Sequence, residues 1–261
     1  MARSDAGPAA GPTAKRNMQR EAFAALAELE DYHWWFEGRR RIIASMLRRL
    51  PLPPSPRILE AGCGSGGSLP MLSTFGSVWG MEPDPEARRL AAERGCATVA
   101  DGSFPDAVSF PGSTFDVIGL FDVLEHLDDD VAALRSLLPR FAPGGHLMLA
   151  VPAFPFLFGP HDVLHAHRQR YTVSILRERL AAAGYRLVHW SYFNFWLFAP
   201  TALIRLLQRR RPPSGHDDLR MSPGLFNGLF TRLLSSEGPI VTRLSVPFGL
   251  SLLVVAQRIG D

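Results

Sequence analysis

A glycine-rich turn behind a short apolar segment constrains this chain more than any other feature. Residues 58–67 have the sequence ILEAGCGSGG. Such a segment is typical of an α/β sheet that brings its backbone close to a nucleotide-like ligand. Gly62, Gly64 and Gly67 fit the G-x-G-x-x-G spacing, so the glycines alone permit a dinucleotide. Glu60 indicates a different ligand, because a carboxylate can pair with an ammonium group, which a pyrophosphate lacks.

The order of apolar segments after this turn predicts the fold class. Strand-like and helical segments alternate from residue 57 onward, which predicts βαβ units and a parallel, doubly wound sheet. We expect strands at 57–61, 78–81, 97–100, 115–120, 146–151, 186–192 and 250–257. The last of these returns late from the end of the chain, so we expect it to pair antiparallel with its predecessor at an edge. The prediction is a Rossmann-like α/β fold of seven strands.

The chain of 261 residues is long enough for one large domain with an elaboration. We expect a disordered tail at 1–17, an N-terminal helical lid at 18–56, a core at 57–192 plus 245–261, and an apolar helical insert at 193–244. The tail has no apolar stretch typical of a signal peptide. Two cysteines make no disulfide framework, and the net charge of +3 is modest. We therefore expect a cytoplasmic protein.

Acidic residues end four successive predicted strands. They are Glu60, Glu82, Asp101 and Asp122. In a doubly wound sheet the ligand lies at the carboxyl ends of the strands, so these side chains should share one crevice. Four carboxylates suit a ligand that carries ribose, adenine and an amino acid but no phosphate, and they would repel a dinucleotide.

Together these motifs resemble class I S-adenosylmethionine-dependent methyltransferases, of the type that includes the ubiquinone-biosynthesis O-methyltransferases. The resemblance rests on five segments in the family's order, namely 60–66, 80–82, 101–102, 121–127 and 141–145. It implies S-adenosylmethionine as cofactor and methyl transfer to a small-molecule or lipid-like acceptor, at oxygen. The alternatives are an N- or C-methyltransferase on a natural product or lipid-linked glycan, and a non-catalytic module that binds the cofactor. A nicotinamide oxidoreductase fits the glycines but is opposed by Glu60 and Asp101, and no basic stripe with interleaved aromatics indicates nucleic acid.

The resemblance also implies roles for individual residues. The methionine part of the cofactor would lie against the glycine turn, its ribose at the end of the second strand, its adenine at the end of the third, and its sulfonium near the end of the fourth. The residues concerned are Glu60, Gly62, Cys63, Gly64 and Gly66, then Glu82 and Pro83, then Asp101, Gly102 and Ser103, then Phe121, Asp122 and Val123.

Two histidine-containing clusters are candidates for acid–base chemistry. His161 and His165 follow the fifth strand in a segment rich in His, Asp and Arg, and histidine can take a hydroxyl proton near neutral pH. His126 belongs to a second cluster, Asp122-x-x-Glu125-His126, which resembles a segment that binds a divalent cation in ubiquinone-pathway enzymes. Asp122 is one methylene shorter than the glutamate found there. We therefore favour a structural interpretation, in which Glu125 and His126 cap and orient the next helix, and we predict no metal.

The insert carries two apolar helical segments, at 193–207 and 223–234, with three consecutive arginines between them. Apolar helices with a basic end could lie on an anionic membrane, which would place the protein peripherally on the inner membrane surface. They could equally line the pocket of a lipid-like substrate or form the face of a homodimer.

Overall fold

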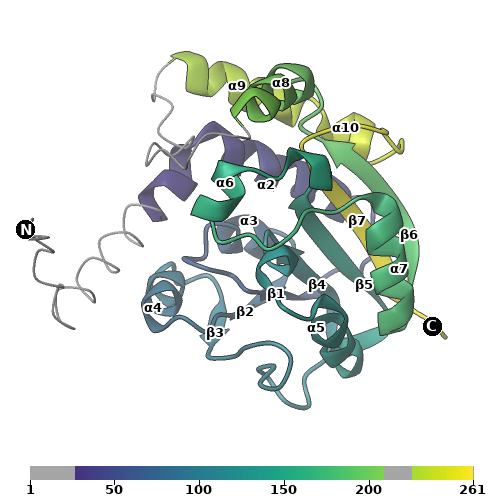
Figure 1. The fold of residues 1–261 in the computed structure, drawn as a ribbon. Coiled ribbons are helices and arrows are strands. Elements are labelled where there is room, and N and C mark those ends of the chain that lie inside the picture. The colour runs from purple at the N-terminus through teal and green to yellow at the C-terminus, as the bar shows by residue number, and fades with distance from the viewer. Residues whose placement is uncertain (1–26, 209–224, 261) are drawn as a thin grey trace, which may run out of the picture.

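A mixed seven-stranded sheet lies at the centre of the computed structural model, which describes residues 27–208 and 225–260 (Figure 1). The strand order is β3-β2-β1-β4-β5-β7-β6. Neighbouring strands from β3 to β5 pair in parallel, and β7 pairs antiparallel with both β5 and β6. The strand bounds are β1 Arg57–Ala61, β2 Ser77–Met81, β3 Thr98–Ala100, β4 Phe115–Phe121, β5 Phe141–Pro152, β6 Tyr185–Phe193 and β7 Ser251–Arg258.

The predicted Rossmann-like fold with an antiparallel last strand is confirmed. One detail differs: β7 pairs with its predecessor β6 as expected, but it also pairs with β5, so β6 is the edge strand. The reason is burial. The apolar run of β7 is buried from Ser251 to Ala256, which suits a strand with neighbours on both sides.

Helices cover both faces of the sheet (Figure 1). Helices α2 and α3 pack on one face, and α5 and α7 pack on the other. The helix bounds are α2 Trp34–Leu47, α3 Leu69–Ser73, α4 Pro85–Glu93, α5 Asp130–Ser136, α6 Pro160–Leu164, α7 Val173–Ala183, α8 Phe198–Gln208, α9 Leu225–Ser235 and α10 Gly238–Val241, with short 3-10 turns η1 Leu124–His126, η2 Leu138–Arg140 and η3 Pro155–Leu157.

Most predicted strand bounds differ from the observed ones by at most one residue, but strand β5 and helix α3 differ by more. The Pro-Gly-Gly sequence at 143–145 predicts a turn before a strand at 146. Strand β5 begins at Phe141 instead, because this sequence forms an irregularity within the strand, where Gly144 has a φ of 71°. The sequence also predicts a helix at 66–75. Helix α3 begins only at Leu69, because Gly66 has a φ of 80°, outside the helical region. The predicted tail 1–17 and the first part of the predicted lid lie outside the described residues.

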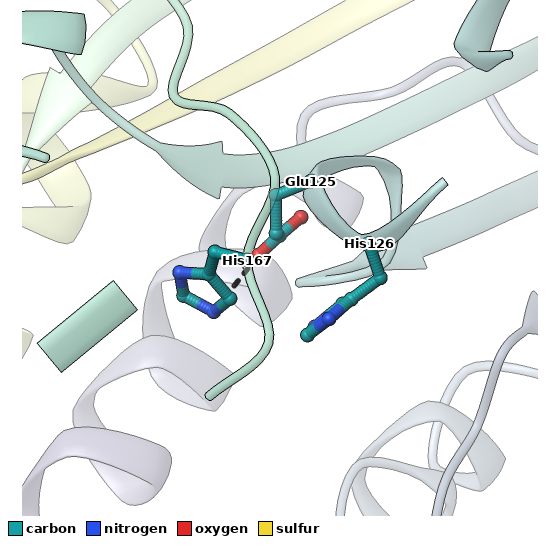
Figure 2. Close-up of side chains that lie close together, drawn as sticks. All are labelled: Glu125, His126 and His167. Atoms are coloured by element: carbon teal, nitrogen blue, oxygen red, sulfur yellow. Dashed lines mark ion pairs between the residues drawn. The ribbon is translucent and has the colours of Figure 1, made fainter. Parts of the chain in front are cut away.

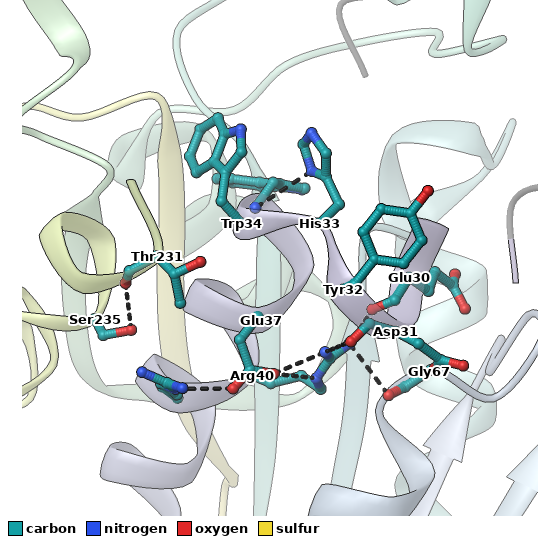
Figure 3. A network of polar contacts seen from close by, with 12 residues as sticks. Glu30, Asp31, Tyr32, His33, Trp34, Glu37, Arg40, Gly67, Thr231 and Ser235 are labelled. Carbon is teal, nitrogen blue, oxygen red and sulfur yellow. Dashed lines mark hydrogen bonds and ion pairs between the residues drawn. The ribbon is translucent and has the colours of Figure 1, made fainter. Parts of the chain in front are cut away.

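The segment before α2 is tied to the glycine turn by Arg40 (Figure 3). The Arg40 guanidinium donates to the backbone oxygens of Glu30 at 2.6 Å and Gly67 at 3.4 Å, and to the Glu37 carboxylate at 2.8 Å. The Glu30 carboxylate in turn accepts a hydrogen bond from the Ser65 hydroxyl in the turn. The N-terminal helices are therefore fixed beside the turn.

Helix α2 also packs against the insert. A Cβ on Gly38 would lie 2.6 Å from Leu234 of α9, so only glycine permits this approach. At the start of α2, the Asn227 side chain of α9 accepts from the Trp34 amide at 2.7 Å and donates to the Tyr32 carbonyl at 2.7 Å. The predicted lid and the predicted insert thus form one layer.

A partly buried ion pair joins α2 to the end of β4. The Arg39 guanidinium, which is almost fully buried, binds the partly exposed Asp122 carboxylate. Asp122 has a φ of 56°, a conformation that aspartate tolerates better than most residues. A charge removed from water is costly when it has no partner. Removal of one member of this pair should therefore destabilise the fold, because the other charge is left unpaired.

Replacement of Arg39 by glutamine tests this contribution. We expect Arg39→Gln to lower the free energy of unfolding by about 3 kcal/mol, because it leaves the Asp122 carboxylate without its cation. Arg41→Gln is the matched control in the same helix, since Arg41 is exposed and pairs with Glu37 at the surface; it should cost less than about 1 kcal/mol. Urea unfolding followed by circular dichroism measures both, and equal losses would contradict the prediction.

Candidate active site

The glycine turn after β1 is held against β2 and is open on its other side. The amides of Gly62 and Cys63 both donate to the Met81 carbonyl, at 2.7 and 3.0 Å. A side chain at Gly62 would collide with Val123, and its φ of 81° also requires glycine. At Gly64 a Cβ would meet nothing within 4 Å. The turn is therefore rigid and leaves space for a ligand above Gly64.

Glu60 is a buried carboxyl group with an unused oxygen. Ser68 gives its side chain a hydrogen bond, whereas Oε2 has no hydrogen-bond partner among the described residues. Burial raises the pKa of Glu60 to about 8, and the nearby Arg39 guanidinium limits that rise. A buried polar atom without a partner is unusual, and an ammonium group would satisfy it.

Glu82 lies at the end of β2, next to the turn. Its Oε2 accepts from the Gly64 amide at 2.9 Å, and its Oε1 accepts from the Asp84 amide at 3.0 Å. Burial raises the pKa of Glu82, while these backbone hydrogen bonds oppose the rise. Each carboxylate oxygen has a second lone pair, so the group is oriented and can still accept from a diol. Pro83 follows it directly.

The end of β3 differs, because the Asp101 side chain is exposed. Its carboxylate pairs with Arg88 at 2.8 Å, and the same guanidinium donates to the Glu82 carbonyl at 2.7 Å. Gly102 packs beneath Ser109, whose hydroxyl donates to the Asp101 carbonyl. Ser103 exchanges backbone hydrogen bonds with Ala107 at 3.0 and 3.1 Å.

The remaining predicted cofactor residues lie around the ends of β1 and β4. Phe121 is buried in the core, and Val123 contacts Gly62. The Asp122 carboxylate is bound by Arg39. The Cys63 thiol is buried, which raises its pKa, so the thiol stays protonated.

The two predicted histidine clusters form one cluster in the structure. Figure 2 shows Glu125 and His126 of one cluster beside His167 from the segment of the other. The segment after α6 docks onto η1: the Arg168 amide donates to the Glu125 carbonyl at 2.8 Å, and the Tyr171 hydroxyl donates to the Leu124 carbonyl at 3.1 Å. This contact brings His167 beside Glu125 and His126. His126 and His167 are 41 positions apart in the sequence.

Four imidazole rings lie close together in this cluster. The ring centroids of His126 and His167 are 5.0 Å apart, and those of His161 and His165 are 4.5 Å apart. The His165 and His167 rings, at 5.9 Å, link the two pairs. Desolvation and the neighbouring His167 lower the pKa of His126, so His126 is neutral at physiological pH.

His167 is the histidine whose orientation is fixed by a buried carboxylate. Its Nδ1 lies 2.9 Å from Asp162 Oδ1, and Asp162 also accepts from Arg170 Nε at 2.8 Å and the Gly159 amide at 2.9 Å. Burial alone would raise the pKa of Asp162, but the hydrogen bonds from His167 and Arg170 outweigh it and hold the pKa below its ordinary value. Because Asp162 is ionised and can only accept, Nδ1 donates to it, and Nε2 is the ring nitrogen left to face other groups.

Sequence reasoning named His161, His165 and His126 as the catalytic candidates and gave no role of its own to His167. No short-range pattern distinguishes His167 from His161 and His165, since each lies near Asp162 in the sequence. The distinguishing feature is a hydrogen bond that depends on how the loop folds.

Glu125 is fully buried, and neither of its carboxyl oxygens has a hydrogen-bond partner among the described residues. Its Oε1 lies 4.0 Å from His167 Nε2, and burial raises its pKa to about 8. The interpretation that Glu125 and His126 cap the next helix is wrong. Asp129 caps α5, by accepting from the Ala132 amide at 2.9 Å, because η1 separates Glu125 from that helix.

Glu125, His126 and His167 could hold a divalent cation. They offer one carboxylate oxygen and two imidazole nitrogens, all within 4.8 Å of one another. Two nitrogens and one oxygen form a donor set that transition metals accept. The cluster proposed from sequence had Asp122 as a ligand, but Arg39 binds that carboxylate and His167 takes its place.

Comparisons with known proteins find similar sequences. A family profile described as "Methyltransferase domain" matches residues 34–190. The 2-methyl-6-phytyl-1,4-hydroquinone methyltransferase of Synechocystis sp. is 34% identical over 104 residues, which cover 38% of this chain and 33% of that protein. The ubiquinone biosynthesis O-methyltransferase of Vibrio parahaemolyticus is 29% identical over 100 residues, or 36% of this chain and 43% of that protein. The chain thus spans well under half the length of these relatives.

Solved structures share the fold. A TehB-like SAM-dependent methyltransferase from Corynebacterium glutamicum superposes with a TM-score of 0.53 and 20% identity, over 95% of this chain and 100% of that one.

The Asp162 hydrogen bonds predict a pH-dependent contribution to stability. Asp162→Asn should lower the free energy of unfolding by about 3 kcal/mol at pH 7, because it leaves Arg170 buried without its carboxylate. The pKa of Asp162 is lower in the folded state, so its contribution is present above the unfolded pKa of about 3.9 and is lost as pH falls through the folded pKa. Asp128→Asn, at an exposed ion pair with Arg168, is the control and should cost less than about 1 kcal/mol. Urea unfolding at pH 7 and in acid measures these differences, and a pH-independent loss would refute the assignment.

Proposed function

The chain belongs to the methyltransferase-domain family, and we propose that it transfers the methyl group of S-adenosylmethionine to a hydroxyl group of a small-molecule or lipid-like acceptor. One observation carries this proposal. The buried, unpartnered carboxyl oxygen of Glu60 lies near the end of β1, and the His167–Asp162 pair lies beside Glu125 of η1, which follows the neighbouring strand β4. Arg39 is close to both Glu60 and Glu125.

The residues at the carboxyl edge fit the cofactor. Glu60 would take its ammonium group, and the oriented Glu82 carboxylate would accept from its ribose hydroxyls. Asp101, Gly102 and Ser103 would lie at its adenine. When bound, the cofactor supplies an electrophilic methyl carbon. The protein's own contribution is then to align the acceptor with that carbon and to exclude water.

The histidine cluster would activate the acceptor. His167 Nε2 would take the hydroxyl proton, and the ionised Asp162 would stabilise the imidazolium that forms. The neighbouring His161 and His165 would bind and orient the acceptor beside it. A hydroxyl acceptor needs such a base more than an amine does, which supports oxygen over nitrogen. One relative is named for a phytyl hydroquinone, which supports a lipid-like acceptor.

Cofactor binding should release a proton. Free Glu60, with a pKa of about 8, is largely protonated at pH 6.5, and it must ionise to pair with the cofactor's ammonium group. The apparent affinity should therefore rise with pH up to about 8, by as much as about tenfold per pH unit. Titration calorimetry at pH 6.5, in two buffers of different ionisation enthalpy, measures the release, which should approach one proton per cofactor.

The Glu60→Gln variant identifies the source of that proton. It should release none and should bind S-adenosylmethionine roughly tenfold to a hundredfold more weakly, because a charge-assisted hydrogen bond is lost. Glu93→Gln, an exposed carboxylate on α4, should behave as the wild type. Wild-type binding without proton release would show that Glu60 is not the ammonium partner.

His167→Gln should lower kcat by about a hundredfold or more, because the amide cannot take the acceptor proton. His161→Gln and His165→Gln should raise KM more than they lower kcat. Transfer of a labelled methyl group from S-adenosylmethionine to a cell extract gives the rates, and extraction into organic solvent separates lipid-like from water-soluble products.

The same assay with a chelator decides between a histidine base and a bound cation. With His167 as the base, activity is unchanged after chelation. A bound cation predicts another result. The purified protein would then contain stoichiometric metal, and both His126→Gln and His167→Gln would lose it. Unchanged kcat in His167→Gln would exclude both roles for this residue.

A further inference from the structure

We propose that α8, α9 and the loop before β7 form a docking surface for an anionic lipid bilayer. We call this the apolar surface and define it by its exposed side chains, which are Trp196, Leu203, Ile204, Leu206, Leu207, Phe226, Leu229, Leu244 and Phe248. The inference rests on the proposed function in one respect only, namely that the bilayer would supply the lipid-like acceptor.

Helices α8 and α9 lie together at one end of the molecule (Figure 1), and most of the exposed apolar side chains belong to them and to the loop before β7. Fifteen large apolar residues are exposed among those described, and nine belong to the apolar surface. Three more lie on the adjoining segment that leads to the histidine cluster, namely Phe156, Val163 and Leu164. Such a concentration, unlike scattered single residues, indicates an interaction site.

The exposed residues are not the side of the helices that packs on the rest of the protein, because each helix has a second face that is already packed. In α8, Ala202 faces inward, while Leu207 is 71% exposed. In α9, Leu234 packs against Gly38, while Phe226 is 68% exposed. Both helices are therefore apolar on the packed face and on the outer face. The packed face contacts the rest of the protein, whereas the outer face is exposed.

The surface is held rigidly by the fold. Phe198 of α8 packs against Phe154 at 5.7 Å and against Phe248 at 5.9 Å between ring centroids. The buried Glu237 carboxylate accepts from the backbone amides of Asn194 at 2.5 Å and Phe195 at 2.8 Å, where the insert leaves β6. The outer apolar face is thus presented by a fixed platform.

Charge distinguishes a lipid surface from other partners. Residues 195–208, 225–236 and 238–250 contain no Asp or Glu, and the intervening Glu237 is fully buried. Arg232 and Arg243 are exposed there, and neither pairs with a carboxylate of a described residue. Elsewhere exposed arginines such as Arg89 and Arg168 do form ion pairs. An apolar face bordered by unneutralised arginines complements anionic headgroups.

The helix lengths suit a position in the membrane interface. Helices α8 and α9 have 11 residues each, about 16 Å, and no helix in 27–208 or 225–260 is long and apolar enough to cross a bilayer. A helix too short to cross a bilayer can lie along the bilayer surface with its exposed apolar side chains inserted.

The surface also borders the candidate active site. Phe154, which contacts α8, opens the segment that continues through η3 and α6 to the histidines. The exposed side chains on that segment continue the apolar surface toward His161 and His165. A lipid-like acceptor could therefore reach the histidines from the bilayer without crossing water.

Vesicle binding by the full chain tests the proposal. Sucrose-loaded vesicles of equimolar phosphatidylglycerol and phosphatidylcholine should bind the protein at least about tenfold more strongly than phosphatidylcholine alone, and added salt should weaken the binding. The double variant Leu207→Ser/Phe226→Ser should lower the partition coefficient at least about tenfold, because it removes two inserted side chains. Arg232→Glu/Arg243→Glu should abolish the preference for anionic vesicles.

A matched pair of substitutions serves as the control. Val188→Ser/Ile259→Ser removes two exposed apolar side chains outside the apolar surface and should leave vesicle binding unchanged. Equal losses in the two double variants, or no binding to anionic vesicles by the wild type, would overturn the proposal. So would a dimer in light scattering that Leu207→Ser/Phe226→Ser converts to a monomer, since a second copy would then cover the surface. Calorimetry with S-adenosylmethionine tests the proposed function separately, because vesicle binding needs no cofactor.

Discussion

The charge of Arg39 is the feature on which the candidate site depends. Arg39 extends from α2 to the sheet, where it binds Asp122 and lies close enough to Glu60 and Glu125 to lower the pKa of both. Burial alone would leave these two carboxyl groups harder to ionise, and burial also lowers the pKa of Arg39 itself. One cation thus opposes the effect of burial on the pKa of two carboxyl groups, Glu60 and Glu125, at the same edge of the sheet. Because it is carried by α2, the electrostatics of the sheet edge depend on the docking of the N-terminal layer.

Much of the fold could be predicted from local pattern, because a buried strand needs a short apolar run and a turn needs glycine. The seven strands and the antiparallel β7 follow from this, and so does the glycine turn at Gly62 and Gly64. The predicted boundaries are wrong where a glycine adopts a backbone conformation that the sequence pattern does not reveal. Gly144 adopts a positive φ inside β5 and bends the strand where the sequence predicts a turn before it. The packing of α2 on α9 could not be predicted, since it depends on the absence of a side chain at Gly38 opposite a residue 196 positions away.

The candidate site divides in the same way. Glu60 and Glu82 could be predicted, because their positions relative to the glycine turn and the strand ends are local. Arg39 could not, because its partner Asp122 is 83 residues distant. His167 could not be told from His161 and His165, because the distinction lies in which imidazole meets the Asp162 carboxylate once the loop has docked on η1. Sequence reasoning found the histidine-rich segment, whereas the hydrogen bond that distinguishes His167 within it is a tertiary contact.

The insert lies between the proposed lipid-docking surface and helix α2. Its helix α9 has an outer face on the proposed lipid-docking surface and an inner face packed on α2, where Gly38 allows close contact. Gly38 is adjacent in sequence to Arg39, so the residue that packs on α9 and the residue that binds Asp122 lie in the same turn of α2. Tightly packed interfaces tolerate little deformation. The position of α2 is therefore fixed from one side by the insert and from the other by a charge pair at the sheet edge.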